Sequence, residues 1–337
     1  MTTRPDIRFD VSSVLHRGCR EYQEDAIATD FPLGAEFGYA VLSDGMGGHA
    51  AGDVASKIVV TEVFSELKFQ SNDAEGFIEN VCEVLTNAAI SANACMAAHT
   101  AANPDTAGMG ATLVAPVFVR DQLFWISIGD SPLYLYREGK LAQLNEDHSL
   151  GPHIDYMVRS GMMHEDVGRN HPDRNALTSV LIGEAIERID CPKKPFQLRD
   201  GDVLVVASDG LQFLSDGEIT ETMDETSNED AASTAEALLA RLKDIEDPEQ
   251  DNISFSVIKV RLNDVNAHDA MNIFTPDFEG RRPAPRQVTT RPIKPVEPTE
   301  APDFVAAAKT EVRQEYRGAE AAPIFLRRRW VASDGPA

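Results

Sequence analysis

Four aspartates in short motifs are the residues of this chain best suited to do chemistry. They are Asp44 in Ser-Asp-Gly-Met-Gly-Gly, Asp130 in Ile-Gly-Asp-Ser, Asp209 in Ala-Ser-Asp-Gly and Asp251 in Asp-Asn-Ile-Ser. Each lies beside a run of residues that predicts a β-strand, and a strand end is a rigid support for a ligand. Carboxylates ligate hard divalent cations, and several that converge in apolar surroundings are costly without a cation. The motifs therefore predict a metal site built from four separate segments.

The elements that must position these aspartates are both strands and helices. Hydrophobic patterns predict strands at 37–43, 111–119, 123–128, 133–137, 141–144, 202–208 and 253–262. Helical spacing predicts helices at 50–69, 74–99 and 227–246. The predicted inner face of the last helix comprises Ala235, Leu238, Leu239, Leu242 and Ile245.

Two predicted turns give the direction of the strands. The residue pairs at 120–121 and 138–139 are predicted to be hairpin turns between neighbouring strands, and hairpins join antiparallel strands. A doubly wound parallel sheet is therefore excluded. Residues 148–194 are rich in His, Gly, Asp, Met and Pro, and we expect them to form an irregular or partly helical flap near the site.

Composition limits the class of protein and of partner. The chain has 337 residues, 42% of them hydrophobic, and a formal net charge of −24, which argues against nucleic acid as a partner. We find no run approaching the roughly 20 apolar residues of a membrane helix, and no apolar signal core at the start. The four cysteines form no CxxC pair. We expect them to be reduced and mostly buried, and the protein to be cytoplasmic.

Residues 1–264 are predicted to form the folded domain, and residues 265–337 a linker and tail. Seven prolines fall between Pro276 and Pro302, which is typical of an extended or disordered segment. Beyond them, 304–318 has the pattern of a short amphipathic helix, and 324–330 is apolar and basic. This last run could dock on a partner or on the strongly acidic domain.

Seven motifs, taken in order, resemble one protein family. They are Arg-Glu-Tyr-Gln-Glu-Asp-Ala at 20–26, Asp-Gly-Met-Gly-Gly-His at 44–49, Gly-Ala-Thr at 110–112, Gly-Asp-Ser at 129–131, Leu-Thr at 177–178, Ser-Asp-Gly-Leu at 208–211 and Asp-Asn-Ile at 251–253. Over residues 10–262 the chain resembles the bacterial branch of the metal-dependent Ser/Thr protein phosphatases, the PPM family of type 2C. The resemblance implies an α+β fold, an α-β-β-α sandwich of two antiparallel sheets flanked by helices.

The resemblance also implies a role for each site residue. Asp44 would bridge two Mn²⁺ or Mg²⁺ ions, the Gly45 carbonyl would ligate one of them, and Asp209 and Asp251 would complete the opposite ion. Glu24 and Asp25 would hold metal-bound waters. Arg20 would bind the substrate phosphate, and Asp130 would ligate a third ion. An all-oxygen site suits these hard ions better than zinc.

The implied activity is hydrolysis of phosphoserine and phosphothreonine in proteins. A hydroxide bridging the two ions would attack the phosphorus, and no covalent intermediate is expected because no cysteine lies in a phosphate loop. The expected partners are phosphorylated proteins, and the enzyme would oppose a bacterial Ser/Thr kinase.

Among the positions that depart from the family pattern, two concern the proton donor and the third metal ion. Met46 stands where several members carry a histidine general acid, although the bacterial branch commonly has Met there. Phe213 replaces the aspartate that usually completes the third site, and Asp216 could substitute only if its loop rearranged. We therefore expect a weak or absent third ion. These departures leave open an alternative, a degenerate non-catalytic module that binds phosphoproteins.

Individual residues also have simpler interpretations. Arg20 could form a surface ion pair with Glu24, four residues later, and Asp251 could cap a loop. Thr112 is more often a strand residue than a catalytic one. His49 is a weak alternative proton donor, more typical of the start of a helix.

Overall fold

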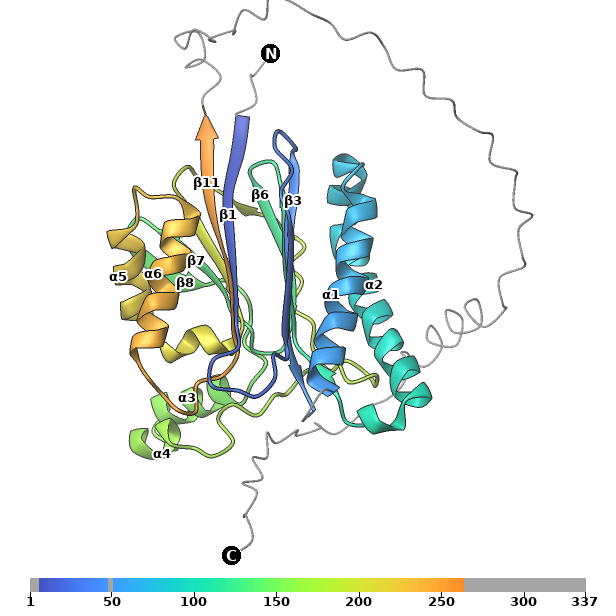
Figure 1. Ribbon diagram of the computed structural model, residues 1–337, viewed down its shortest axis with the longest axis vertical. Helices are drawn as coiled ribbons and strands as arrows, with labels where there is room; N and C mark the ends of the chain where they lie inside the picture. Colours follow the sequence, from blue (N-terminus) through green and yellow to red (C-terminus); the bar gives the residue numbers. More distant parts are fainter. Residues whose placement is uncertain (1–5, 48–50, 264–337) are drawn as a thin grey trace, which may run out of the picture. The chain divides into compact units, whose positions relative to one another are not determined.

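The computed structural model describes residues 6–47 and 51–263, which form two antiparallel sheets between two layers of helices (Figure 1). One sheet has the strand order β1-β11-β10-β7-β8, and the other β2-β3-β5-β6-β9 with β4 paired to β3. The α-β-β-α sandwich expected from the sequence is confirmed. The predicted boundary at 264, the tail and His49 lie outside the described residues.

The strands and helices have the following bounds. The first sheet contains β1 (Asp6–His16), β7 (Leu133–Arg137), β8 (Lys140–Gln143), β10 (Val203–Ala207) and β11 (Ile253–Asn263). The second contains β2 (Asp25–Asp30), β3 (Phe37–Met46), β4 (Gly110–Ala111), β5 (Leu113–Val119), β6 (Gln122–Ile128) and β9 (Phe196–Gln197). The helices are α1 (Ala51–Gln70), α2 (Ala74–Ala102), α3 (Gly151–Arg159), α4 (Glu165–Arg169), α5 (Asp216–Glu225) and α6 (Ala231–Asp244), with 3-10 turns at Pro104–Thr106 and Asp209–Phe213.

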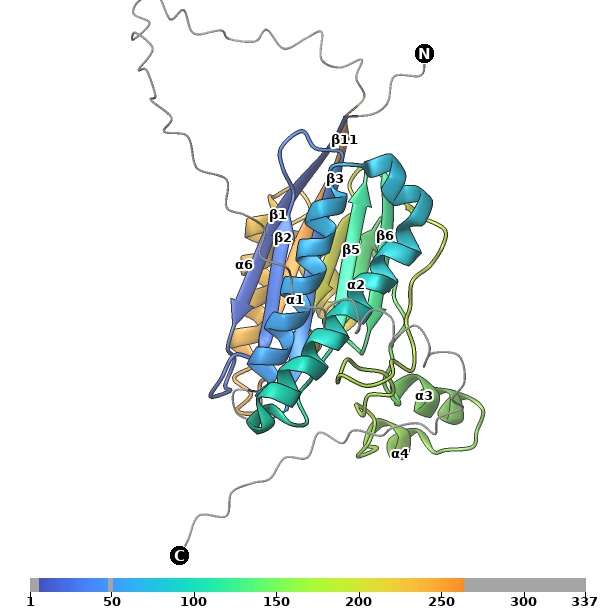
Figure 2. The same cartoon turned by 90° about the vertical axis from the view of Figure 1, so that its right-hand side faces the viewer.

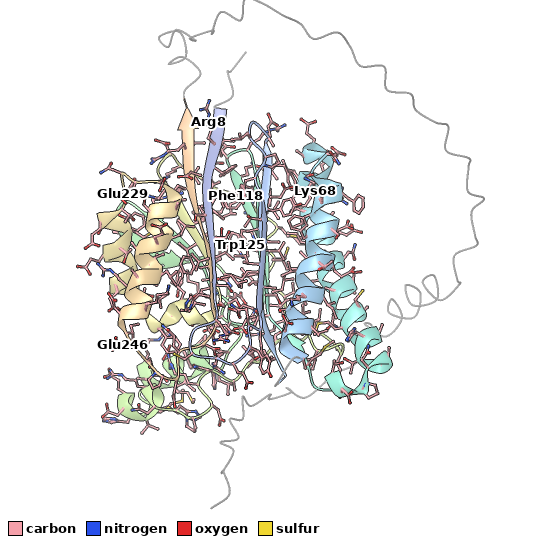
Figure 3. All side chains as sticks on the ribbon, in the orientation of Figure 1. Arg8, Lys68, Phe118, Trp125, Glu229 and Glu246 are labelled. Atoms are coloured by element: carbon pink, nitrogen blue, oxygen red, sulfur yellow. The ribbon has the colours of Figure 1, made fainter. Side chains whose placement is uncertain are left out.

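Strand β3 shows why the middle of the sandwich is apolar on both faces. Tyr39 and Val41 pack toward α1 and α2, whereas Ala40 and Leu42 pack toward the other sheet. Successive side chains of a strand point to opposite faces, so a strand covered on both sides reads as a continuous apolar run. Phe118 lies in the same layer between the sheets (Figure 3).

Each sheet is covered by its own pair of helices. Helices α1 and α2 lie on the sheet that contains β3 and β5 (Figure 2), and α5 and α6 cover the other sheet. By length and composition α2 would be long and apolar enough to cross a membrane, which the sequence analysis did not anticipate. Its Phe77 and Leu85 are fully buried in the core against the sheet, so α2 packs as a core helix.

A small lobe containing α3 and α4 lies at one end of the sandwich (Figures 1 and 2). It has two short helices in otherwise irregular chain, as predicted for 148–194. A bridge between Ser149 and Leu177 closes its base, and Arg174 forms two hydrogen bonds to Asp155 within it.

Several predicted details were wrong. Strands β1 and β2 and helix α5 were not predicted. Helix α6 begins at Ala231 instead of residue 227, and Ile245 is 39% exposed beyond its end. Asp44 lies inside β3, not in a turn, because β3 continues to Met46 by pairing with β4.

The expectation for the cysteines was also only partly right. All four are free, but Cys19 is exposed and the other three are only partly buried.

Candidate active site

Strands β2 and β3 place two predicted carboxylates side by side. Asp25 and Asp44 are directly opposite partners in the antiparallel ladder, and both are almost fully buried. Opposite residues share one face of a sheet, and here Leu42 shows that this face points toward the other sheet. The amide of Gly45 donates to the carbonyl of Glu24 at 3.1 Å. Four of the predicted residues therefore gather at one end of the sandwich.

Asp25 joins the two sheets at this end. Its Oδ2 accepts hydrogen bonds from the hydroxyls of Ser208, at 2.8 Å, and Ser254, at 2.7 Å. Ser208 directly follows β10, and Ser254 is the second residue of β11. The pKa of Asp25 is raised to about 7, mainly by burial and in part by the charges of Asp209 and Asp251, while the two hydrogen bonds from the serine hydroxyls lower it. Asp209 and Asp251 therefore act electrostatically on the same buried carboxylate.

Close backbone packing brings the segments of Asp209 and Asp251 together. The Ser208 amide donates to the Ser254 carbonyl at 2.8 Å. A Cβ on Gly210 would lie 1.9 Å from the Asn252 carbonyl oxygen, so only glycine fits there. The Ser-Asp-Gly and Asp-Asn-Ile motifs are thus packed backbone to backbone, which explains the glycine that follows Asp209.

Asn252 fixes the loop that carries Arg20. Its Oδ1 accepts from the Glu24 amide at 2.7 Å, and its Nδ2 donates to the carbonyls of Arg17, at 2.8 Å, and Tyr22, at 2.9 Å. Arg20 forms an ion pair with Asp251. Asn252 lies in the Asp-Asn-Ile motif, but the sequence alone predicts no role for it. Its partners are backbone groups more than 200 residues away, which sequence patterns do not reveal.

Thr112 supports Asp44 directly. Its amide donates to the Asp44 carbonyl at 2.9 Å, and its Oγ1 accepts from the Asp44 amide at 3.0 Å. The same hydroxyl is 2.7 Å from Ser131 Oγ. Thr112 separates β4 from β5, so the single strand predicted for 111–119 is interrupted at this residue.

The turn that carries Asp130 is tied to the base of the lobe. The Gly129 amide donates to His148 Nδ1 at 3.2 Å, and the His148 amide donates to the Gly129 carbonyl at 3.0 Å. The His148 carbonyl accepts from the Thr178 amide at 2.7 Å. Burial lowers the pKa of His148, which favours the neutral ring that Nδ1 needs as an acceptor. His148 was not singled out from the sequence, where it lies in no recognised motif.

Phe213 supplies no oxygen to the site. It is partly buried and packs against the core beneath α5 and α6. Asp216 is the first residue of α5, and Ser215 and Glu218 form a capping box that fixes this helix start. The loop rearrangement that Asp216 would need is not seen.

The donor set fits hard divalent cations. The nearby groups are carboxylates and backbone carbonyls. The pKa of Asp25 is raised mainly by burial and to a smaller extent by the charges of Asp209 and Asp251, and bound cations would offset such charges. Within residues 6–47 and 51–263, three or more His, Cys, Asp or Glu side chains do not meet around a single point. Mg²⁺ typically keeps several waters and uses only one or two carboxylates, so a site without three converging side chains is compatible with such ions.

Comparison with known proteins identifies a family and several relatives. The protein phosphatase 2C family model matches residues 15–250. The serine/threonine protein phosphatase PstP of Mycobacterium tuberculosis is 34% identical over 183 residues, which cover 54% of this chain and 33% of that protein. The serine/threonine phosphatase stp of Listeria welshimeri is 34% identical over 171 residues, covering 51% of this chain and 65% of that protein. The match thus spans less than two thirds of either relative.

A solved structure shares the fold over the described region. The crystal structure of the catalytic domain of PstP in complex with two manganese ions covers 76% of this chain and 99% of that one, with 28% identity and a TM-score of 0.60. The family match spans most of the chain, and the two-sheet sandwich agrees with it. On these grounds the chain belongs to the protein phosphatase 2C family.

Proposed function

We propose that this protein is a metal-dependent phosphatase that hydrolyses phosphoserine and phosphothreonine in proteins. The observation that carries the proposal is the gathering of Asp25, Asp44, Asp209 and Asp251 at one end of both sheets, with Arg20 on Asp251. The family match and the phosphatase names of the relatives support the same activity.

The proposed ligands of two Mn²⁺ or Mg²⁺ ions are Asp44, the Gly45 carbonyl, Asp209 and Asp251, with Glu24 and Asp25 behind them. The two manganese ions in the PstP catalytic domain support a pair of ions. When bound, such ions neutralise phosphate charge and lower the pKa of water toward neutrality. We assign Asp130 to a third, weak site, since Phe213 cannot supply its other oxygen.

Arg20 is proposed to bind the substrate phosphate. Its planar guanidinium presents donors in a fork that matches two phosphate oxygens. Its side chain is 25% exposed and is oriented by Asp251, so the fork is held beside the carboxylates while remaining accessible to a ligand.

The proposed partners are phosphorylated proteins and a Ser/Thr kinase whose products the enzyme dephosphorylates. The proposed location is the cytoplasm. The tail beyond residue 264 is proposed as a linker that docks a partner or the domain itself.

One observation favours a second candidate function, a non-catalytic phosphoprotein-binding module. Phe213, at the position where the family pattern has an aspartate, is partly buried and packs against the core.

Hydrolysis of p-nitrophenyl phosphate and of a phosphothreonine peptide, measured over a Mn²⁺ titration, distinguishes the two functions. The enzyme should be active only with metal, and Asp44→Asn and Asp209→Asn should lose at least about a hundredfold in kcat. Asp121→Asn, in the β5–β6 hairpin, is the matched control and should keep its rate. Binding of the phosphopeptide without turnover at any metal concentration would favour the module.

A further inference from the structure

Asn93 is a buried polar residue on an otherwise apolar face of α2. It is 5% exposed, whereas the other buried residues of this helix are apolar, namely Phe77, Val81, Leu85, Ala88, Ala89, Ala92 and Met96. A buried amide is costly unless each of its polar atoms has a partner. The partners of Asn93 therefore indicate what it stabilises.

All of its partners lie in one backbone turn. Asn93 Oδ1 accepts from the amides of Ile182, at 3.1 Å, and Gly183, at 2.7 Å, and Nδ2 donates to the Glu184 carbonyl at 2.5 Å. Three hydrogen bonds from one side chain fix the position and orientation of this turn, which follows the lobe in the sequence.

Gly183 shows how closely the turn lies against α2. Its φ is +82°, a region that favours glycine, and a Cβ there would come within 2.9 Å of Ala97 Cα, one helical turn beyond Asn93. The helix therefore contacts the turn both through the Asn93 amide and through the bare backbone at Ala97.

Residues 181–183 also hold β4, the short strand beside the candidate site. Leu181 and Ala111 exchange two backbone hydrogen bonds, at 2.9 and 3.0 Å. Ala111, in β4, is the ladder partner of Gly45 in β3. A continuous series of short contacts thus runs from Asn93 through residues 181–183 and β4 to Gly45, next to Asp44.

We propose that Asn93 is a positioning residue of the candidate active site. By holding residues 182–184 it fixes β4, and β4 fixes the Gly45 carbonyl that would ligate a metal ion. The metal part of this inference rests on the proposed function, whereas the positioning of β4 does not.

Two measurements on Asn93→Leu test the proposal, with Asn87→Leu, an exposed site on the same helix, as the matched control. Hydrogen exchange of the metal-free protein should be at least about tenfold faster at the Ala111 and Leu181 amides in Asn93→Leu. Calorimetric titration without substrate should show Mn²⁺ binding weakened by about tenfold or more, as for other partners of metal ligands. Asn87→Leu should match the wild type in both.

A second pair of variants perturbs the same turn from the backbone side. Gly183→Ala and Gly201→Ala both place a Cβ at a φ near +80°, but only the first would meet another atom within 4 Å. Gly183→Ala should therefore reproduce the faster exchange and the weaker Mn²⁺ binding, and Gly201→Ala should not. This pair decides the matter if Asn93→Leu fails to fold.

The outcomes separate the two proposals. Wild-type exchange at Ala111 in both Asn93→Leu and Gly183→Ala would overturn the positioning role, and so would a lower melting temperature with unchanged Mn²⁺ affinity. If the wild type bound no Mn²⁺, the proposed function would fail, and faster exchange at Ala111 would still support the role of Asn93 in holding β4.

Discussion

Asp44 and Thr112 hold each other through hydrogen bonds in both directions, from the Thr112 amide to the Asp44 carbonyl and from the Asp44 amide to Thr112 Oγ1. The same hydroxyl contacts Ser131, the neighbour of Asp130. The backbone of the central carboxylate and the turn of the proposed third-site carboxylate are therefore joined by one hydroxyl group.

Thr112→Val should impair the site without changing side-chain volume. The substitution removes Oγ1 and leaves the buried Asp44 amide without its acceptor, which costs about 1–3 kcal/mol of stability. The carboxylate next to it would be less well held, and we expect Mn²⁺ affinity to fall by about tenfold. Calorimetric titration of the metal measures this directly.

Thr222→Val is the control for that experiment. Thr222 is fully buried, but its hydroxyl donates to the Glu218 carbonyl within α5, away from the carboxylates. It should lower stability and leave the metal affinity unchanged. Equal effects of the two variants on affinity would show that Thr112 acts only through general stability.

The raised pKa of Asp25 predicts a pH-dependent stability of the metal-free protein. The folded pKa of about 7 lies above the ordinary value of 3.8, so the folded state binds the proton more tightly than the unfolded chain. Stability from this group is therefore greatest below about pH 4 and declines as pH rises to 7, by at most about 4 kcal/mol. Asp25→Asn removes this dependence and should be the more stable protein at pH 8 in a chelator.

Urea unfolding from pH 4 to pH 8 checks this prediction, with the difference between wild type and Asp25→Asn as the measured quantity. Added Mn²⁺ should stabilise the wild type more at pH 8 than at pH 5, since cations offset the charged carboxylates. Parallel stability curves for the two proteins in chelator would contradict it.

The sequence predicted the elements whose apolar pattern is strong. Helices α1 and α2 and the β5–β6 and β7–β8 hairpins were correct, and the positive φ values of Arg120 and Glu138 match the predicted turns. The edge strand β2 was missed because five of its six residues are polar or small, which leaves it without a clear apolar pattern. Helix α5 was missed although its capping box, Ser215 with Glu218, was a readable signal.

The acids of the candidate site could be proposed from the sequence, but the residues that hold them in place could not. The aspartates stand in recognisable motifs, whereas Asn93, Asn252 and His148 act on backbone groups that no local pattern connects to them. An asparagine that pairs with a carbonyl 230 residues away is indistinguishable in the sequence from one on the surface.

Arg20→Ala should weaken phosphate binding more than it slows turnover. Losing the fork removes two charge-assisted hydrogen bonds to the substrate, so we expect KM to rise by about tenfold or more. Arg20→Lys should recover only part of this, since an ammonium cannot bind two oxygens in the same way. Arg17→Ala, three residues away, is the control. A normal KM in Arg20→Ala would argue for a purely structural pairing with Asp251.

Phe213→Asp should exchange packing for an oxygen donor. The ring is partly buried against the core beneath α5 and α6, so we expect a loss of about 2 kcal/mol, less than for a fully buried phenylalanine. If a carboxylate at position 213 is all that the third site at Asp130 lacks, calorimetry should detect one more weak Mn²⁺ site than in the wild type. Phe213→Asn, similar in size but neutral, should lose the same stability and gain no site. An unchanged number of bound ions in Phe213→Asp would mean that the loop between Asp209 and α5 does not turn residue 213 toward Asp130.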